Sequence, residues 1–253
     1  MTNNTPNLFG LLGKDISYSF SKSFFIEKFN NEKLNATYQN IDVKSIDYLL
    51  DFLANNIETL KGFNITIPYK EEIFQYLDQI SDDAQEIGAV NCVKLIDNQY
   101  LHGFNTDSFG FIESLKPLLE NQHKKALILG TGGASKAIAF SLKKLAIDFK
   151  FVSRNPLENQ LSYKELNNEL INEHLLIINT TPLGTKGKHE NELPKIPYQY
   201  VTDKHLLYDL VYNPEITNFL QKGLDCNAKI KNGLEMLILQ AEKSWEIWTN
   251  DPF

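Results

Sequence analysis

The chain has 253 residues, of which 42% are hydrophobic and 23% are charged, an ordinary globular composition that excludes a largely disordered protein. The formal net charge of -7 argues against a nucleic-acid partner, because such proteins usually carry a basic surface. No apolar stretch approaches the roughly 20 residues that span a membrane, and no secretion signal is visible, so we expect a cytoplasmic protein.

Apolar runs alternate with amphipathic helical patterns in the first half of the sequence. The pattern predicts strands over residues 7–13, 36–43 and 62–68, helices over 21–34, 45–56 and 69–80, and then a hairpin of strands 89–96 and 100–105 with Asp97-Asn98 as its turn. The helix over 45–56, for example, carries Ile46, Leu49 and Leu53 on one face. This β-α-β-α-β order predicts a mostly parallel α/β sheet in the first domain.

A second βαβ series follows a helix predicted over 107–119. Its strands are predicted to begin in KALIL, from residue 125, and to recur within 149–155, 174–182 and 206–214. A last helix over 233–248 follows the series, and its apolar stripe favours packing back on the first domain. We therefore expect two α/β domains, residues 1–106 with 233–253 and residues 107–232, the second of them Rossmann-like.

The segment ALILGTGGASKA is the most specific local motif. An apolar strand runs directly into GTGGA, residues 130–134, and then into a helix. Gly130 would allow the tight turn, and Gly132 or Gly133 would let backbone N–H groups approach a pyrophosphate at the helix start. Ser135 stands where the third glycine of the G-x-G-x-x-G pattern would be, so a plain glycine-rich turn is the alternative interpretation.

The next predicted strand ends in Ser153, Arg154 and Asn155, about twenty residues beyond the glycine segment. An NAD enzyme would place an Asp or Glu near this point for the ribose hydroxyls, and the strand end carries none. An arginine suits the 2′-phosphate of NADP, because its planar guanidinium can donate several hydrogen bonds to a phosphate. The pattern therefore favours NADP, whereas Arg154 taken alone would be read as a surface residue.

Polar residues of the first half fall near the ends of predicted strands, where an open parallel sheet forms its ligand crevice. In chain order they are Ser19, Ser21, Asn64, Thr66, Lys70, Asn91, Asn105, Thr106 and Asp107. Asn64 and Thr66 alternate along a strand, so their side chains share one face. Hydroxyls, amides, one lysine and one aspartate together suit a small ligand that carries hydroxyl and carboxylate groups.

Taken together, these motifs make the chain similar to the shikimate dehydrogenase family. Nine segments resemble those of the family, in the same order and over nearly the whole chain: GKDISYSFSKS, FNITIPYK, GAVN, GFNTDSFG, GTGGASKA, SRN, NTTPLG, YDLVYNP and NGLEMLILQA. The resemblance implies a substrate domain and an NADP-binding domain, with the C-terminal helix returning to the first. It also implies reversible NADPH-dependent reduction of 3-dehydroshikimate to shikimate, a step of chorismate and aromatic amino-acid biosynthesis.

The resemblance implies roles for the matching residues. Lys70 and Asp107 would be the catalytic pair. The substrate would be bound by Ser19, Ser21, Asn64, Thr66, Lys70, Asn91, Asp107, Tyr212 and Gln240. NADP would be bound by Gly130, Thr131, Gly132, Gly133, Ala134, Ser153, Arg154, Asn179, Thr180, Thr181, Leu210, Gly233 and Met236. No metal is implied, and both a monomer and a homodimer remain open.

Several of these residues also have a purely structural interpretation. Ser21 could cap the helix that follows it, Asp107 could cap the helix over 107–119, and Gln240 could be an exposed helix residue. Lys70 lies at the predicted start of the helix over 69–80, where the partial positive charge of a helix end is unfavourable for a cation. Such a helix start and partial desolvation would lower the pKa of this lysine, which suits proton exchange with a substrate oxygen, whereas a close Asp107 carboxylate would raise it, and the sequence leaves the balance open.

Two other functions remain open from the sequence. One is a quinate/shikimate dehydrogenase relative with relaxed substrate or NAD use, since the run NPLENQ after Arg154 holds no second basic residue. The other is a catalytically silent nucleotide-binding sensor on the same scaffold, which the presence of Lys70 and Asp107 disfavours. Cys92 and Cys226 lack the spacing of metal ligands, which predicts two reduced thiols.

Overall fold

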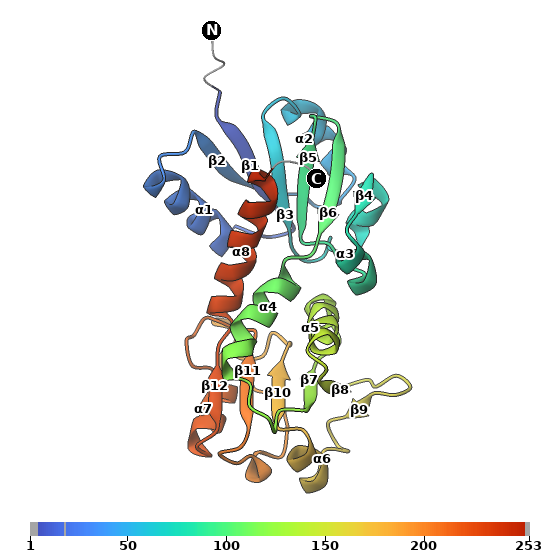
Figure 1. The fold of residues 1–253 in the computed structure, drawn as a ribbon, viewed down its shortest axis with the longest axis vertical. Helices are drawn as coiled ribbons and strands as arrows, with labels where there is room; N and C mark the ends of the chain where they lie inside the picture. The colour runs from blue at the N-terminus through green and yellow to red at the C-terminus, as the bar shows by residue number, and fades with distance from the viewer. Residues whose placement is uncertain (1–4, 18, 251–253) are drawn as a thin grey trace. The chain divides into compact units, whose positions relative to one another are not determined.

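The computed structural model describes residues 5–17 and 19–250 (Figure 1), and no helix within these residues is long and apolar enough to cross a membrane. The chain divides into two compact units: Met1–Thr106 with Ala241–Phe253, and Asp107–Gln240. In the described residues each unit is built on one six-stranded sheet. Residues 233–240, expected with the first domain, lie in the second unit by this division, and the functional domain limits stay a prediction.

The first sheet is mixed and has the strand order β2-β1-β3-β5-β6-β4. Its strands are β1 (Asn7–Gly13), β2 (Ala36–Asp42), β3 (Leu60–Ile65), β4 (Gln79–Ile80), β5 (Cys92–Ile96) and β6 (Tyr100–Phe104). β1 pairs in parallel with β2 and β3, whereas β5 runs antiparallel to β3 and β6. The predicted hairpin is confirmed, and Asp97 and Asn98 turn with φ of 53° and 52°, a left-handed conformation that these residue types tolerate.

Helices α1 (Phe20–Asn31), α2 (Tyr48–Asn56) and α3 (Asp82–Ile87) lie between these strands in the chain. The helix predicted over 69–80 is wrong: Glu72–Tyr76 form a short 3-10 helix, and the chain then enters β4. The reason is a tertiary hydrogen bond, because the Lys70 carbonyl accepts from the Val90 N–H (2.8 Å) and not from Phe74, as it would in an α-helix. The Phe74 N–H bonds to the Glu71 carbonyl instead (3.4 Å), with the spacing of a 3-10 turn.

Two apolar clusters pack against the first sheet, one mainly aliphatic and one aromatic. The aromatic cluster holds Phe9, Phe25, Phe29, Tyr38, Trp245 and Trp248. Its two tryptophans come from α8 (Leu234–Thr249), whose residues from Ala241 onward belong to the first unit, as expected for a returning helix. Trp248 Nε1 donates to the Val93 carbonyl (2.9 Å), and a Cβ on Gly62 would overlap the indole, so Gly62 makes room for it.

The second sheet is entirely parallel and has the order β12-β11-β10-β7-β8-β9. Its strands are β7 (Lys125–Leu129), β8 (Asp148–Ser153), β9 (Leu161–Ser162), β10 (Leu176–Asn179), β11 (Leu206–Asp209) and β12 (Lys229–Lys231). Numbered within this unit, the order is 3-2-1-4-5-6, the Rossmann topology that the sequence predicts. The strand order reverses between β7 and β10, and in such sheets ligands bind outside the carboxyl ends of the strands at this switch point.

Helices cover both faces of the second sheet. α4 (Asp107–Leu115) and α5 (Gly133–Lys144) pack on one face, and α6 (Asn168–Glu173) and α7 (Asn218–Asp225) on the other. Successive residues of β7 show the division, since Ile128 packs with Phe111 and Ile138, whereas Leu127 packs with Phe219. Burial on both faces explains why these strands read as continuous apolar runs.

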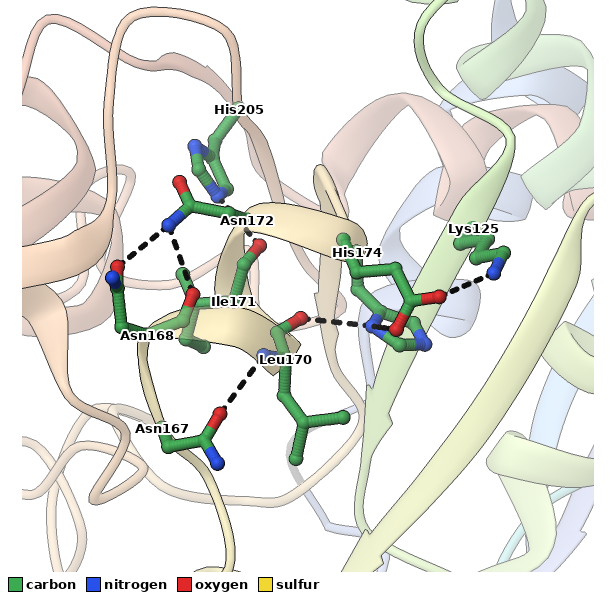
Figure 2. Close-up of polar contacts among 9 residues, drawn as sticks. Lys125, Asn167, Asn168, Leu170, Ile171, Asn172, His174 and His205 are labelled. Carbon is green, nitrogen blue, oxygen red and sulfur yellow. Dashed lines mark hydrogen bonds and ion pairs between the residues drawn. The ribbon is translucent and has the colours of Figure 1, made fainter.

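Polar contacts fix α6 against the amino ends of β7 and β11 (Figure 2). Asn167 caps the helix, its Oδ1 accepting from the Leu170 N–H (3.0 Å). The ring nitrogen Nε2 of His205, just before β11, lies 3.1 Å from the Ile171 carbonyl oxygen. Lys125, the first residue of β7, forms an ion pair with the last residue of α6. These contacts hold α6 at the amino ends of the strands, the end of the sheet opposite to the ligand-binding edge.

Candidate active site

The glycine-rich segment begins at the switch point of the second sheet. Gly130 directly follows β7 and has a φ of +109°, which favours glycine. A Cβ at this position would lie 2.9 Å from Thr180 Oγ1 and 3.0 Å from Thr181 Cγ2, in the segment that follows β10. The turn therefore requires glycine both for its backbone conformation and for close approach.

Helix α5 begins just after this turn and presents an anion-binding end. Gly132 is the N-cap and has no side chain to accept from the first-turn N–H groups, and a Cβ on Gly132 or Gly133 would meet no atom within 4 Å. Thr131 beside them is exposed and Ala134 is half-buried. Ser135 is buried, and its hydroxyl donates back to the Gly132 carbonyl (2.6 Å). The first turn thus offers backbone N–H donors at two glycines whose Cβ positions are open, which suits a pyrophosphate.

The end of β8 adds a cation to the same edge of the sheet. The Gly130 N–H donates to the Val152 carbonyl (2.9 Å), which joins the glycine turn to this strand end. Ser153 is buried, and the adjacent Arg154 is exposed. Burial raises the pKa of the Tyr163 hydroxyl, and the positive charge of Arg154 opposes that rise, which places the guanidinium near this ring. Arg154 can therefore contribute a second anion contact beside the start of α5.

The ends of β10 and β11 complete the edge. Thr180 donates both its N–H and its hydroxyl to the Leu129 carbonyl (3.0 and 2.8 Å), and the Leu210 N–H donates to the Asn179 carbonyl (3.0 Å). A Cβ on Gly233 would overlap the Leu210 carbonyl oxygen, so only glycine fits there. The structure thus brings together, within the second unit, the predicted residues Gly130, Asn179, Thr180, Thr181, Leu210 and Gly233.

The other predicted residues of the last segments differ in exposure. Gln240 is 7% exposed, and its Nε2 donates to the Leu237 carbonyl (2.8 Å), so its interpretation as an exposed helix residue is wrong. Met236 is buried in the core of the second unit. Both lie close to α4, because a Cβ on Gly110 would be 2.5 Å from the Met236 carbonyl oxygen. Tyr212 is 36% exposed, and partial burial raises the pKa of its hydroxyl.

A buried acid at this edge was missed by the sequence reasoning. Asp209, the last residue of β11, is fully buried, and desolvation raises its pKa to about 6. Its carboxylate accepts from Asn179 Nδ2 (2.9 Å), the Val211 N–H (3.0 Å) and Thr217 Oγ1 (2.6 Å). The available signal was a single acid that closes the apolar strand LLYD, since a buried carboxyl group needs hydrogen-bond donors.

In the first unit, Asn64 and Asn91 lie in one buried hydrogen-bond network. Tyr38 Oη donates to Asn64 Oδ1 (2.9 Å), and Asn64 Nδ2 donates to Ser244 Oγ (2.9 Å) and to the Asn91 carbonyl (3.2 Å). The hydroxyls of Ser244 and Thr106 are 3.2 Å apart, and the Thr106 N–H donates to Asn91 Oδ1 (2.6 Å). The sequence reasoning assigned no role to Tyr38 or Ser244. Ser244 and Thr106 connect the two predicted amides, and Tyr38 binds Asn64.

The two serines after β1 have different local roles. Ser19 is the N-cap of α1, and its hydroxyl accepts from the Lys22 N–H (3.4 Å), so the cap considered for Ser21 is wrong. Ser21 lies in the first turn and hydrogen-bonds to Tyr38, which connects it to the Asn64 network. Thr66 follows β3, where its N–H donates to the Leu12 carbonyl (2.9 Å), and it is half-buried like the serines.

Lys70 and Asp107 are both half-buried and belong to different units. Lys70 lies in the turn between β3 and the short 3-10 helix. The α-helix start expected at Lys70 is therefore absent, and its effect on proton release does not apply. Asp107 is the first residue of α4, where a helix end stabilises a carboxylate. The pairing of these two side chains in catalysis stays a prediction.

The donor set of the second unit fits a dinucleotide that carries an extra phosphate. The first turn of α5 supplies backbone N–H groups beside two glycines with open Cβ positions, and Arg154 supplies a guanidinium at the neighbouring strand end. Among the described residues, no group of three or more His, Cys, Asp or Glu side chains is arranged to hold a metal ion.

Comparison with known proteins gives a consistent result. A model of the shikimate dehydrogenase substrate binding domain matches residues 11–93. The shikimate dehydrogenases (NADP(+)) of Methanococcus aeolicus and Caldanaerobacter subterraneus are 37% and 34% identical to the chain, covering 98% and 99% of it and 94% of each relative. The crystal structure of shikimate 5-dehydrogenase from Thermus thermophilus with NADP(H) and shikimate is 30% identical, with a TM-score of 0.84, covering 96% of this chain and 93% of that one. The chain therefore belongs to the shikimate dehydrogenase family.

Proposed function

We propose that this protein is a shikimate dehydrogenase, an NADP-dependent oxidoreductase that interconverts 3-dehydroshikimate and shikimate on the route to chorismate. The observation that carries the proposal is the start of α5, where Gly132 and Gly133 face open space beside an exposed Arg154. Relatives named shikimate dehydrogenase (NADP(+)) match the chain over nearly its whole length, and the related Thermus structure holds NADP(H) and shikimate. The alternative of a silent sensor has no comparable support.

The second unit would hold NADP at its carboxyl edge. The pyrophosphate would bind the N–H groups at Gly132 and Gly133, and the 2′-phosphate would bind Arg154. Thr180, Leu210 and the segment from Gly233 would line the part of the site nearer the substrate. When bound, NADP supplies the hydride chemistry, and the residues of the chain bind, orient and manage one proton.

The first unit would hold the substrate through hydroxyls and amides. Ser19 and Ser21 would donate to the substrate carboxylate. Asn64 has a more specific role, because both of its N–H groups already donate within the protein, to Ser244 and to the Asn91 carbonyl. Its Oδ1 accepts one hydrogen bond from Tyr38 and retains a second lone pair. Asn64 would therefore accept from a substrate hydroxyl and would not donate to it.

Lys70 would handle the proton of the reaction. Reduction of the carbonyl group requires a proton at the oxygen when hydride reaches the carbon, and an ammonium group can donate it. Asp107 would hold this ammonium group and orient it toward the oxygen. The same lysine would take the proton back in the oxidation of shikimate.

The direct test of the function is reduction of NADP⁺ by shikimate, followed through nicotinamide absorbance. We expect fast reduction with shikimate and NADP⁺, and slower or no reduction when quinate or NAD⁺ replaces either partner. Faster reduction with quinate or NAD⁺ would favour the relaxed relative. No reduction with any pair would leave a nucleotide-binding protein and would overturn the proposal.

Lys70→Ala tests the catalytic assignment. We expect kcat to fall by about 100-fold or more, the usual contribution of a positioned acid or base, while the KM for shikimate changes far less. Lys61→Ala is the matched control, because Lys61 is a half-buried lysine at the opposite end of β3, and its kcat should stay near that of the wild type. Near-normal turnover of Lys70→Ala would remove Lys70 from the mechanism.

The proposal includes a cytoplasmic location. Cys92 and Cys226 are both free thiols, which is the usual state in a reducing compartment. Burial raises the pKa of the Cys92 thiol to about 12, so this cysteine has no thiolate character for chemistry at neutral pH. Small-molecule substrate and cofactor are the partners that this function requires.

A further inference from the structure

The two oxygen atoms of the Asp209 carboxylate accept hydrogen bonds from different segments of the chain. Oδ1 accepts from Asn179 Nδ2 (2.9 Å), just before the loop that follows β10, and from the Val211 N–H (3.0 Å), in the loop that follows β11. Oδ2 accepts from Thr217 Oγ1 (2.6 Å), the N-cap of α7. All three donors are neutral, so the buried carboxylate is satisfied by hydrogen bonds that each fix one segment.

Asp209 determines the orientation of the Asn179 amide. An ionised carboxylate only accepts hydrogen bonds, so the amide nitrogen of Asn179 must face Asp209. The amide oxygen then points the other way and accepts from the Thr181 N–H (3.0 Å) and from Thr181 Oγ1 (2.6 Å). A neutral amide at position 209 could donate as well as accept, and both orientations of Asn179 would become possible.

The segment that Asn179 fixes, Thr180 and Thr181 after β10, lies beside the glycine turn at Gly130. A Cβ on Gly130 would lie within 3.0 Å of both Thr180 Oγ1 and Thr181 Cγ2, so these threonines lie directly beside the turn. On the other side, the Gly233 N–H donates to the carbonyl of Val211 (3.1 Å), the residue whose N–H is bound to Asp209 Oδ1. One oxygen atom thus holds the loops after β10 and β11, two neighbouring strands on the same side of the switch point.

We propose that Asp209 is a positioning residue of the cofactor site, acting through Asn179 and Val211 to hold the loops after β10 and β11 in the conformation that binds NADP. The inference rests on the proposed function, since it takes this edge of the second sheet to be the cofactor site. Asp209 itself is fully buried and need not touch the cofactor. Its other oxygen serves the start of α7, which is a structural contact.

The test is the Kd for NADPH, measured by fluorescence titration of the purified protein without substrate. For Asp209→Asn we expect the Kd to rise about tenfold, the equivalent of roughly one hydrogen bond, with the KM for shikimate within about twofold of the wild type. Thr217→Val is the matched control, because it removes the donor to Oδ2 and leaves Oδ1 intact. It should lower thermal stability and leave the NADPH Kd within about twofold of the wild type.

A second variant keeps the test decisive if Asp209→Asn does not fold. Asn179→Ala removes the amide that transmits the effect and leaves Asp209 its bonds to Val211 and Thr217, and it should raise the NADPH Kd by a similar factor. In the double variant Asn179→Ala/Asp209→Asn, we expect a Kd no larger than that of the weaker-binding single variant. Equal rises in Asp209→Asn and Thr217→Val, or no rise in Asn179→Ala, would overturn the proposal.

The binding assay also separates this inference from the proposed function. Inactive wild-type protein that still binds NADPH would refute the dehydrogenase and leave the positioning role of Asp209 testable in full. If the wild-type protein catalyses reduction of NADP⁺ by shikimate but Asp209→Asn binds NADPH with an unchanged Kd, the dehydrogenase function stands and the positioning role of Asp209 is refuted.

Discussion

Each unit of the molecule contains a buried hydrogen-bond network, and the two networks differ in charge. The network of the first unit joins Tyr38, Asn64, Asn91, Thr106 and Ser244 and consists of neutral amides and hydroxyls. The network of the second unit is centred on the carboxyl group of Asp209. A neutral group can both donate and accept, whereas a carboxylate only accepts, so the second network fixes bond direction at a cost in desolvation.

The difference follows from where each network finds its partners. Ser244 reaches the first network from α8, far along the chain from β3, so this network depends on the return of a distant helix. Asp209 finds Asn179 at the end of the adjacent parallel strand and Val211 two residues away. A neutral network can join distant elements without a charge to neutralise, and a buried charge is best satisfied by donors held close by the same sheet.

The largest expected effect concerns pH and the charged network. The pKa of Asp209 is about 6 in the folded protein, against an ordinary value of 3.8, so the folded state keeps a proton that the unfolded chain releases. Between these values the stability contributed by Asp209 falls as pH rises, by roughly 3 kcal/mol in all, and it is constant above about pH 6 to 7. Asp209→Asn does not titrate. The wild type should therefore lose about this much free energy of unfolding relative to Asp209→Asn between pH 4 and 7.

Urea unfolding of both proteins, followed by circular dichroism at each pH, measures this difference. Burial lowers the pKa values of three buried histidines, His123, His174 and His205, so their contribution to stability rises with pH. Comparing the two proteins at the same pH cancels this contribution. A constant difference between wild type and variant across this pH range would show that Asp209 titrates normally and that the two networks do not differ in this respect.

The next effect concerns the neutral network. Tyr38→Phe removes the hydroxyl that donates to Asn64 and leaves the ring stacked on Phe25, with centroids 4.7 Å apart. We expect a loss of about 1–2 kcal/mol in the free energy of unfolding, because Asn64 Oδ1 loses a buried donor. The pKa of Tyr38 is raised well above 10 by burial, so this loss should be the same at pH 5 and pH 8.

Tryptophan fluorescence can follow this unfolding selectively, because both tryptophans of the chain, Trp245 and Trp248, belong to the first unit. The KM for shikimate should also rise in Tyr38→Phe, since Asn64 Oδ1 loses one of the hydrogen bonds that orient the amide. A pH-dependent loss would contradict the neutral character of the network.

The smallest effect is expected outside both networks. Ser19 caps α1 through a long hydrogen bond of 3.4 Å to the Lys22 N–H, so Ser19→Ala should cost about 0.5–1 kcal/mol of stability. If Ser19 also binds the substrate carboxylate, the KM for shikimate should rise while kcat stays within a few-fold of the wild type. Thermal unfolding and steady-state kinetics on the same preparation separate the two contributions, and an unchanged KM would leave Ser19 as a cap alone.

The sequence predicted the sheets better than the connections. Strand β1 was predicted with its observed limits, and the hairpin turn at Asp97-Asn98 is correct because residue types with access to left-handed conformations mark such turns. The edge strands β4, β9 and β12 were missed, and so were the short helices α3, α6 and α7, since six to eight residues carry little helical periodicity. Their caps were the available signals, because Asn167 and Thr217 each accept from an N–H three residues later.

The failure at residues 69–80 has a different cause. The apolar spacing there is helical, and Ile73 is indeed buried, but the Lys70 carbonyl is bound by Val90, which the local sequence cannot reveal. The same limit applies to the site. The motifs predicted the glycine turn and the polar strand ends, whereas Tyr38 and Asp209 act on other side chains and become visible only when their partners are placed.

The division of α8 between the units has a consequence for biosynthesis. All six strands of the first sheet precede the second unit in the chain, whereas Trp245 and Trp248 follow it. At roughly 5–20 residues per second, a ribosome needs on the order of ten seconds to make the intervening segment. During that time the Trp248 indole is missing from the space at Gly62 and from the Val93 carbonyl. The first unit is therefore the first to be synthesised and the last to be completed. In the interval the nascent chain would need protection of its aromatic surface.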